Sequence, residues 1–354
     1  MTAAWAERLA MSRALALGNA VLGATSPNPP VGAVILAADG EPVGEGATAP
    51  AGGPHAEVAA LAEAGGRARG GTAVVTLEPC AHTGRTGPCT EALLAAGIAR
   101  VVVAVPDPTE LAGGGAEALR AAGVAVEVGL ERPAAEAGAL ASWLTAVRTR
   151  RPYVVWKAAA TLDGRVAAAD GTSRWITGPD ARAAVHRLRA TCDAVVVGSG
   201  TALADDPQLT VRTPDGTPAP RQPLRVVVDR RGRVPATARV HDGAAPTHVS
   251  TAGTAGQLLT ELYDRDVRRL LLEGGPTLAA AFLREGVVDE VVLHLAPSLL
   301  GDGAHLVGDL GISTISQALS LTVVDVTRRG GDVEIRLRPA GQTGGSDPER
   351  ETGS

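Results

Sequence analysis

The sequence predicts an α/β protein built from two domains. At 354 residues the chain is longer than most single domains, which cluster at roughly 100 to 200 residues, so two domains are expected. Helical runs alternate with short Val-rich runs in both halves, a pattern typical of a largely parallel sheet between two layers of helices. The basic cluster of Arg148, Arg150 and Arg151, followed by Pro152, marks the expected domain boundary.

The first domain is expected to begin with a helix over residues 2–22, where apolar residues recur at helical spacing. Prolines within residues 26–30 end this helix, because each proline holds its predecessor in extended geometry. A hairpin follows, and its Asp39-Gly40 turn supplies the positive dihedral angles that tight turns require. The predicted strands of this half are residues 31–36, 42–46, 72–77, 100–105 and 124–128, and its later helices are residues 55–64, 90–96 and 133–147.

The second domain is expected to continue the alternation and to end in a hairpin turned at Gly330-Gly331. Its predicted strands are residues 153–158, 194–197, 224–229, 269–272, 287–293, 321–327 and 333–337. From residue 341 onward Gly, Ser, Thr, Asp, Glu and Pro dominate, and such a segment cannot bury enough apolar surface to become ordered. Residues 341–354 are therefore predicted to be a disordered tail.

Charge and composition limit the class of partner. A formal net charge of -5 gives no overall attraction to nucleic-acid phosphates or anionic lipid, so we expect neither as a partner. No stretch is apolar enough to span a bilayer, and the first 18 residues lack the apolar core of a signal peptide. Three cysteines without an export signal favour a reducing, cytoplasmic location, in which thiols are free to bind metal.

Two short motifs carry the strongest chemical signal: Pro-His-Ala-Glu, and Leu-Glu-Pro-Cys followed nine residues later by a second cysteine. A catalytic zinc takes three protein ligands and keeps one position for water, and His55, Cys80 and Cys89 supply such a set. Glu57 is the candidate proton shuttle, as in the His-x-Glu signature of zinc deaminases. This geometry requires that His55 and Cys89 each stand at the start of a helix, where the helix dipole favours a thiolate.

Blander interpretations of these residues remain open. The cysteines are nine apart instead of the three of the general signature, and the group could be a structural zinc knuckle or an ordinary buried cluster without metal. His82 could close the site as a fourth ligand, although a place in the substrate pocket or in loop packing is favoured. Cys192, in the other half of the chain, is interpreted as an inert core or edge residue.

The second domain contains two glycine turns that follow predicted strands. The turn at residues 198–200 does not fit the dinucleotide fingerprint Gly-x-Gly-x-x-Gly, because Leu203 occupies the third glycine position, so a standard Rossmann site is not expected. The turn at residues 273–277 opens a helix, whose exposed amides make a plausible pyrophosphate cradle. Taken alone, such a turn equally often only connects a strand to a helix.

Several motifs in sequence order resemble the bifunctional deaminase/reductase of riboflavin biosynthesis. In the first half they are residues 28–32, 55–57, 77–82 and 84–89, and in the second half 157–164, 171–177, 188–190, 201–210, 222–225 and 273–278. The long cysteine spacing is itself typical of that family. The resemblance implies a cytidine-deaminase-like three-layer domain over residues 1–147, followed by a dihydrofolate-reductase-like α/β domain over residues 152–340.

The resemblance also implies the activity and the cofactors. The first domain would use zinc to deaminate 2,5-diamino-6-(5-phosphoribosylamino)pyrimidin-4-one by hydrolysis, with Glu57 moving the protons. The second would use NADPH to reduce the ribosyl arm of the product to a ribityl chain. The substrate is thus a small phosphorylated pyrimidine, and a homo-oligomer is a further expectation whose size the sequence does not give.

Site residues carry over from the family by matching motif. By this resemblance Asn28 contacts the pyrimidine, while its alternative interpretation is an ordinary turn asparagine. The residues that would line the NADPH site are Ala160, Trp175, Thr201, Asp205, Gly275, Pro276, Thr277, Leu278, Ala279, Ala280 and Ala281. The residues that would face the substrate of the reductase are Ser173, Arg189, Leu209, Arg212 and Glu273. Lys157 either places charge near the reduced carbon or forms a structural ion pair.

Two rival functions are also consistent with the zinc motifs. One is a nucleoside or nucleic-acid deaminase with an unrelated appended domain, which the acidic charge and the phosphate-suited arginines of the second half both disfavour. The other is a non-catalytic scaffold with a structural zinc. The chain also departs from the family in having Gly87 where a proline is expected and Ala33 where a cysteine is common, although neither change removes a proposed ligand.

Overall fold

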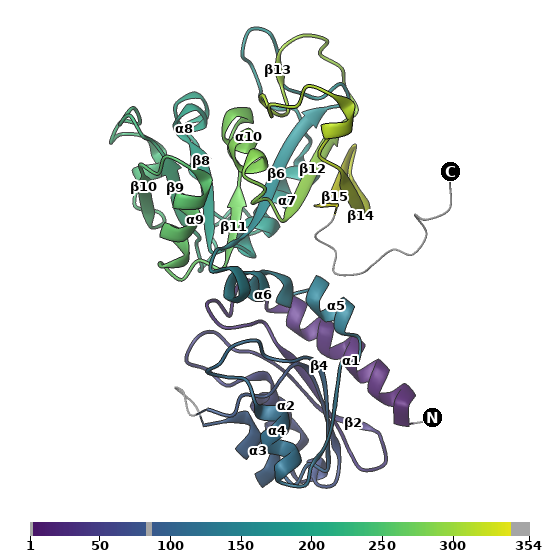
Figure 1. Cartoon of the computed structure of the whole chain (residues 1–354). Helices are drawn as coiled ribbons and strands as arrows, with labels where there is room; N and C mark the ends of the chain where they lie inside the picture. Colours follow the sequence, from purple (N-terminus) through teal and green to yellow (C-terminus); the bar gives the residue numbers. More distant parts are fainter. Residues whose placement is uncertain (1–2, 83–86, 341–354) are drawn as a thin grey trace, which may run out of the picture. The chain divides into compact units, whose positions relative to one another are not determined.

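The computed structural model describes residues 3–82 and 87–340, and these form two compact units (Figure 1). Of the described residues, those up to Tyr153 together with Thr260–Arg269 form the first unit, and Val154–Leu259 together with residues 270–340 form the second. The segment predicted to be a disordered tail lies outside the described residues. Within the described part of the chain, no helix is both long enough and apolar enough to cross a membrane.

The first unit is built on a five-stranded sheet with the strand order β2-β1-β3-β4-β5. Strand β1 pairs antiparallel with β2 and β3, whereas β3, β4 and β5 run parallel. The strands are β1 (Gly32–Leu36), β2 (Pro42–Ala47), β3 (Thr72–Leu77), β4 (Arg100–Val105) and β5 (Ala125–Val128). The alternation read from the sequence thus predicted all five strands, with errors of one residue at their ends.

Helices cover both faces of this sheet (Figure 1). They are α1 (Ala3–Ala20), α2 (Ala56–Ala64), α3 (Cys89–Ala95), α4 (Gly115–Ala121), α5 (Arg132–Ala137) and α6 (Leu140–Thr149), and a short 3-10 helix follows α2 at Gly65–Ala68. Helices α2, α3 and α4 lie on one side of the sheet, and α1 and α5 lie on the other. Close contact between layers depends on glycine: a Cβ atom on Gly46 in β2 would lie 2.2 Å from the carbonyl oxygen of Ala56 in α2.

The single helix predicted over residues 133–147 is wrong, because the chain breaks it into α5 and α6. Gly138 ends α5 with a ψ angle of -139°, far from helical geometry. Glycine loses more backbone freedom in a helix than any other residue, so a turn between two helices is a favourable place for it. The apolar spacing on either side of Gly138 did not reveal the break.

The second unit is built on an eight-stranded sheet with the order β10-β9-β8-β11-β6-β12-β15-β14. Its strands are β6 (Tyr153–Thr161), β8 (Ala194–Gly198), β9 (Leu224–Val228), β10 (Thr247–Ser250), β11 (Arg269–Leu272), β12 (Glu290–Ala296), β14 (Leu321–Arg329) and β15 (Asp332–Pro339). Strands β10, β9, β8 and β11 pair in parallel, as do β6 and β12, whereas β15 is antiparallel to β12 and β14. The predicted hairpin at Gly330-Gly331 is confirmed.

The remaining elements of this unit connect the strands and cover the sheet (Figure 1). The helices are α7 (Pro179–Ala190), α8 (Ser199–Asp205), α9 (Ala255–Tyr263) and α10 (Pro276–Arg284), with 3-10 turns η2 (Arg239–His241) and η3 (Ile315–Gln317). A small separate sheet pairs β7 (Arg165–Ala167) with β13 (Ala304–His305). The sequence had predicted neither β7 and β13 nor β10.

Strand β12 begins three residues later than predicted. The amide of Val287 donates to the carbonyl oxygen of Phe282, and the amide of Gly286 donates to that of Leu283, so both amides close the last turn of α10. The strand then extends to Ala296, because β6 continues to Thr161 and the two residues are partners in the ladder. The apolar run predicted the strand, and the end of the preceding helix determines the residue at which the strand begins.

Candidate functional site

The first unit brings together the three side chains predicted to bind metal. The ligand atoms of His55, Cys80 and Cys89 all lie within 4.8 Å of one another. The Nδ1 atom of His55 is 3.2 Å from the sulfur of Cys89 and 3.7 Å from that of Cys80. Cys89 is fully buried and Cys80 is 8% exposed, so two sulfurs and one imidazole nitrogen converge in a protected place.

Helix starts position two of these ligands, as predicted. His55 is the N-cap of α2, with φ -73° and ψ 163°, and Cys89 is the first residue of α3. Cys80 follows β3 across Glu78 and Pro79, and its sulfur accepts a hydrogen bond from the amide of Cys89 at 3.4 Å. Amide groups and the positive end of a helix stabilise a thiolate, so the local structure suits a metal ligand.

The electrostatics of the two thiols fit a bound cation. A hydrogen bond from Cys89 lowers the pKa of Cys80 to about 4, and the same bond together with burial raises the pKa of Cys89. Two thiolates this close repel each other, so only one of them ionises readily while no positive charge lies between them. A divalent ion removes that conflict, because metal ligation requires both thiolates. The donor set of two sulfurs and one imidazole is one that zinc prefers.

Glu57 lies in the first turn of α2 and is only 4% exposed. Burial raises its pKa, and its carboxyl also interacts with the side chains of His55 and Cys89. A carboxyl that is buried beside a metal-binding group and has a raised pKa can accept and return a proton near neutral pH. Within the described residues Glu57 is not a member of the metal-binding group itself, which contains three ligands.

Glu78 fixes the turn that carries Cys80, a role that the sequence analysis missed. Its Oε1 atom accepts a hydrogen bond from the amide of Ala116 at 2.8 Å, and its Oε2 atom accepts one from the amide of Asp107 at 2.9 Å. One carboxylate therefore ties the end of β3 to the loop after β4 and to the start of α4. The only signal in the sequence was an acidic residue inside an otherwise apolar motif.

Asn28 and His82 lie in loops of the same unit. The Asn28 loop is held by two hydrogen bonds with Thr25: the Asn28 amide donates to the Thr25 carbonyl, and the Thr25 hydroxyl donates to the Asn28 carbonyl, each at 3.0 Å. His82 is half-buried and stands outside the three-ligand group, and among the described residues its Nδ1 atom has no hydrogen-bond partner. Part of the insertion between the cysteines, residues 83–86, lies outside the described residues.

The second unit contains a cavity of about 1380 Å³. Most of the residues that the resemblance had assigned to NADPH or substrate line it: Lys157, Ser173, Trp175, Arg189, Thr201, Asp205, Leu209, Glu273, Gly275, Pro276, Thr277, Leu278 and Ala281. The others do not: Ala160, Ala279 and Ala280 are buried within their elements, and Arg212 is exposed, with its guanidinium donating to Gln208 Oε1 and to the carbonyl oxygen of Gly216. The structure thus gathers segments that are far apart in the sequence around one space.

A buried ion pair and a lysine contribute charge to the wall of this cavity. Arg189 donates to both carboxylate oxygens of Glu273, at 2.6 and 2.8 Å, and to the carbonyl oxygen of Thr210 at 3.0 Å. Burial acts to raise the pKa of Glu273, but the charge and hydrogen bonds of Arg189 and the charges of Lys157 and His186 together outweigh it, so the pKa of Glu273 is lowered. Burial lowers the pKa of Lys157, which lies near the same pair.

The start of α10 supplies backbone donors to the same cavity. Gly275 is the N-cap and Pro276 is the first helical residue, and the amide of Gly275 donates to the hydroxyl of Thr201 at 3.2 Å. The unpaired amides of a helix start and its dipole suit the phosphate groups of a dinucleotide. Within the stretch from Gly275 to Ala281, the first turn of α10 and Ala281 line the cavity.

Several cavity residues were not found from the sequence. His186 on α7 lines the cavity, and its Nδ1 atom accepts a hydrogen bond from the amide of Arg212 at 3.3 Å. Three arginines that follow β9, Arg230, Arg231 and Arg233, line it as well, and Arg233 donates to the hydroxyl of Ser199 at 2.7 Å. The signal in the sequence that could have indicated them was the cluster of arginines directly after a predicted strand.

These two sites define a two-domain enzyme in which a metal-dependent deaminase is joined to a cofactor-dependent reductase. Residues 4–105 match the cytidine and deoxycytidylate deaminase zinc-binding region, and residues 152–335 match the RibD C-terminal domain. The chain belongs to the RibD family of bifunctional deaminase/reductases of riboflavin biosynthesis. Zinc is the metal of the deaminase domain and NADPH is the cofactor of the reductase domain.

Relatives and solved structures resemble the chain over nearly its whole length. The riboflavin biosynthesis protein RibD of Mycobacterium tuberculosis (strain H37Rv) is 49% identical over 328 residues, which cover 93% of this chain and 96% of that protein. RibD of Escherichia coli (strain K12) is 40% identical over 360 residues, with coverages of 92% and 98%. Acinetobacter baumannii RibD, form 1, has a TM-score of 0.87 at 40% identity and covers 95% of this chain and 99% of its own.

A further solved structure carries its activity in its name. It is a diaminohydroxyphosphoribosylaminopyrimidine deaminase/5-amino-6-(5-phosphoribosylamino)uracil reductase from Thermotoga maritima. Its TM-score is 0.87 at 34% identity, with coverage of 95% of this chain and 99% of that chain. The likeness therefore extends over both units and is not confined to one of them.

Proposed function

We propose that the chain deaminates 2,5-diamino-6-(5-phosphoribosylamino)pyrimidin-4-one and then reduces the ribosyl arm of the product to a ribityl chain. The observation that carries this proposal is the buried carboxyl of Glu57 beside the converged group of His55, Cys80 and Cys89. The name of the Thermotoga maritima relative supports the choice of substrate. We also propose that residues 1–147 are the deaminase domain and residues 152–340 the reductase domain.

In the deaminase domain, His55, Cys80 and Cys89 would hold the zinc, which supplies activation of water when it is bound. Glu57 accepts a proton from the attacking water and delivers it to the departing amine. Its raised pKa supports this double role, because the carboxyl exchanges protons more readily near neutral pH than a surface glutamate does. Asn28, on its proline-bounded loop, presents an amide that can hydrogen-bond the edge of the pyrimidine.

In the reductase domain, NADPH supplies the hydride when it is bound. The amides at the start of α10, with Thr201, Asp205 and Trp175, would hold the cofactor. The residues proposed to face the substrate are Ser173, Arg189, Leu209, Arg212 and Glu273. Planar guanidinium groups suit the phosphate of the substrate. Lys157 is proposed to place positive charge near the reacting carbon, which its position close to Glu273 supports.

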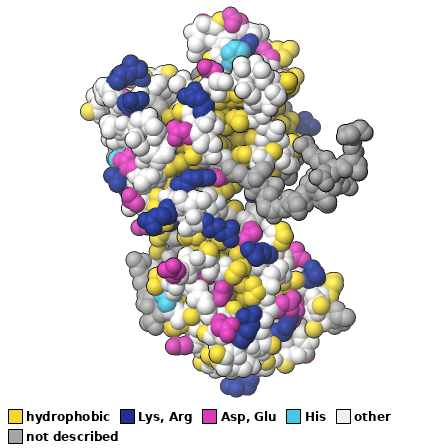
Figure 2. All heavy atoms as spheres, in the orientation of Figure 1, with side chains coloured by type: hydrophobic (Ala, Val, Ile, Leu, Met, Phe, Trp, Pro, Cys, Tyr) yellow, Lys and Arg dark blue, Asp and Glu magenta, His cyan; other side chains and the backbone are white. Residues whose placement is uncertain are grey.

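We propose a cytoplasmic location, small-molecule substrates and no binding of nucleic acid or membrane. Among the described residues Cys80, Cys89 and Cys192 form no disulfide, which supports a reducing compartment. On the face that Figure 2 shows, basic and acidic side chains are interspersed, which supports the absence of a surface for nucleic-acid phosphates. A homo-oligomer is proposed as well. Its support is the edge strand β14, where Val323, Val324 and Val326 are each more than half exposed.

The proposal is tested by incubating the purified protein with the phosphoribosylamino-diaminopyrimidine and following ammonia and NADPH oxidation separately. Ammonia should appear without NADPH, and NADPH should be oxidised only after ammonia has been released. Oxidation of NADPH without prior ammonia release would contradict the proposed order of steps. Absence of ammonia in a zinc-loaded preparation would contradict the proposed substrate.

A further inference from the structure

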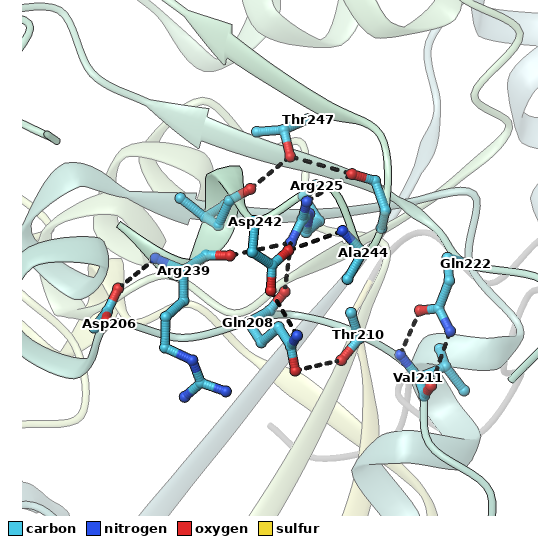
Figure 3. A network of polar contacts seen from close by, with 12 residues as sticks. Asp206, Gln208, Thr210, Val211, Gln222, Arg225, Arg239, Asp242, Ala244 and Thr247 are labelled. Carbon is cyan, nitrogen blue, oxygen red and sulfur yellow. Dashed lines mark hydrogen bonds and ion pairs between the residues drawn. The ribbon is translucent and has the colours of Figure 1, made fainter. Parts of the chain in front are cut away.

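Arg225 is a charged side chain that is completely buried in the second unit, yet it does not line the cavity. Figure 3 shows it within a network of polar contacts. Arg225 lies in β9, where its Nη1 atom donates to the Oδ1 atom of Asp242 at 2.8 Å. Its Nη2 atom donates to the carbonyl oxygen of Ala245 at 2.6 Å. Burying a guanidinium is costly unless its charge is paired and its N–H groups find acceptors, and among the described residues the Nε atom of Arg225 has none. The burial of this ion pair therefore calls for a functional or structural reason.

The ion pair is connected to Arg212 through a single amide side chain. The Nε2 atom of Gln208 donates to Asp242 Oδ2 at 2.6 Å, and Gln208 Oε1 accepts from Arg212 Nη2 at 2.7 Å (Figure 3 shows all but Arg212). The hydrogen bond from Arg225 lowers the pKa of Asp242 to about 2, so Asp242 acts only as an acceptor. An acceptor on one side forces the amine of Gln208 toward it and leaves the carbonyl oxygen for Arg212.

The backbone that carries Gln208 also forms part of the cavity wall. Leu209 is buried, lines the cavity and has a positive φ of 55°, a conformation that must be held by its surroundings. Gln222 holds the next stretch by bonding both the amide and the carbonyl oxygen of Val211, at 2.7 and 2.9 Å. The carbonyl oxygen of Thr210 accepts from Arg189. This stretch is thus held both by Gln222, which does not line the cavity, and by Arg189, which does.

We propose that Arg225, Asp242 and Gln208 form a hydrogen-bond relay that positions the guanidinium of Arg212 for the phosphate of the reductase substrate. The inference rests on the proposed function, in which Arg212 faces that substrate. Arg225, Asp242 and Gln208 are positioning residues, since they act through Arg212 and touch neither substrate nor cofactor. At each step, which partner donates and which accepts is set by the hydrogen bond before it. Substitutions that exchange donor and acceptor can therefore reverse the order of donors and acceptors along the relay, which we call its polarity.

The polarity predicts the effect of two single substitutions. Gln208→Met keeps the Arg225–Asp242 ion pair but cuts its link to Arg212. In Asp242→Asn, the side-chain oxygen of residue 242 still accepts from Arg225, but its new NH2 group faces Gln208. Gln208 must then turn its oxygen toward residue 242 and its own NH2 group toward Arg212, so the hydrogen bond to Arg212 is lost. Each variant should raise the KM for the deaminated, phosphorylated substrate about tenfold, the order of magnitude for losing one hydrogen bond to a charged group. The kcat and the dissociation constant for NADPH, measured by fluorescence titration, should stay within about twofold of wild type.

Reversing both partners should restore the relay. In the double variant Asp242→Asn with Gln208→Glu, the new amine of residue 242 donates to one carboxylate oxygen of residue 208, and the other oxygen accepts from Arg212. The KM should return to within about threefold of wild type, a rescue that general damage to the fold does not produce. In an Arg212→Met background, Gln208→Met should have no further effect on KM.

The outcomes separate the relay from the function on which it rests. An unchanged KM in Gln208→Met would overturn the relay. So would a rise in KM that Gln208→Met causes equally in the Arg212→Met background. In both cases the proposed function stands as long as the wild-type protein turns over the substrate. Equal losses of NADPH affinity would also overturn the relay, because the whole cavity would then be disturbed. If Arg212→Met has the KM of wild type, both the relay and the proposed role of Arg212 fail, although the reductase activity itself does not.

Discussion

Glu57 illustrates how the position of one carboxyl determines its chemistry. A glutamate at the exposed start of a helix would be an ordinary anion that complements the helix dipole. Glu57 is buried instead, and its pKa is raised, while His55 ahead of it in the chain turns toward the two sulfurs. The two residues are only two positions apart, so the start of one helix carries both a proposed metal ligand and the proposed proton carrier.

Glu78 is predicted to control the metal affinity of the first site without touching the metal. Glu78→Ala removes the acceptor of the Asp107 and Ala116 amides and frees the turn that carries Cys80. Loss of a group that supports a ligand typically weakens metal binding by about 10- to 100-fold, and we expect a change of that size in zinc affinity. Competition with a chromophoric chelator measures it.

The control for this experiment is Glu117→Ala, in α4 of the same unit. The side chain of Glu117 is 82% exposed, and it forms a surface ion pair with Arg120. Its removal should leave zinc affinity unchanged. A Glu78→Ala protein that binds zinc as tightly as wild type would show that the turn before Cys80 keeps its shape without these hydrogen bonds.

The sequence predicted the metal-binding residues better than the residues that support them. His55, Cys80 and Cys89 could be found because each belongs to a short motif whose chemistry is recognisable from residue type and spacing. The partners of Glu78 are backbone amides, which carry no signal in the sequence. Arg225 and Asp242 could not be paired either, because their contact depends on how η2 follows β9 in the folded unit.

At the scale of elements, the packing of α1 on β1 depends on Gly32. A Cβ atom there would lie 1.9 Å from the carbonyl oxygen of Ala14, a backbone atom that cannot turn away. Gly32→Ala should therefore push the helix from the sheet and destabilise the protein by about 1–3 kcal/mol, the usual cost of overpacking. Thermal unfolding followed by calorimetry measures the loss.

A matched substitution exists at Gly66, in the 3-10 helix after α2, where an added Cβ atom would meet no other atom within 4 Å. Gly66→Ala should leave the unfolding temperature unchanged or raise it slightly, because alanine reduces the freedom of the unfolded chain. Equal unfolding temperatures for both variants would mean that α1 can move away from β1 at no cost.

The sequence predicted those elements whose ends are set by the pattern of residues within the segment. It missed those whose existence or ends depend on contacts with other elements. The Val-rich strands β3 and β4 have the predicted ends, because an apolar run between polar turns leaves little choice of boundary. Strand β10 has the sequence Thr-His-Val-Ser and no apolar run, and it exists because β9 offers a free edge beside it. The break at Gly138 and the late start of β12 likewise depend on contacts outside the segment.

At the scale of the whole molecule, each unit contains its own site, and the metal-binding group and the large cavity share no residue. Removal of zinc by a chelator should therefore abolish ammonia release. NADPH oxidation with substrate that has already been deaminated should continue at close to the original rate. Adding zinc back should restore ammonia release, and a parallel loss of both activities would instead show that the reductase depends on the metal.

The substitution Glu57→Gln tests the proposed proton transfer directly, because it removes the proposed proton carrier and keeps the size of the side chain and the three proposed metal ligands. The zinc content of the purified variant and its rate of ammonia release should be measured together. We expect one zinc per chain, as in the wild type, with ammonia release slower by at least about 100-fold, the contribution typical of general acid–base catalysis. Zinc at full occupancy with ammonia release at the wild-type rate would contradict the account.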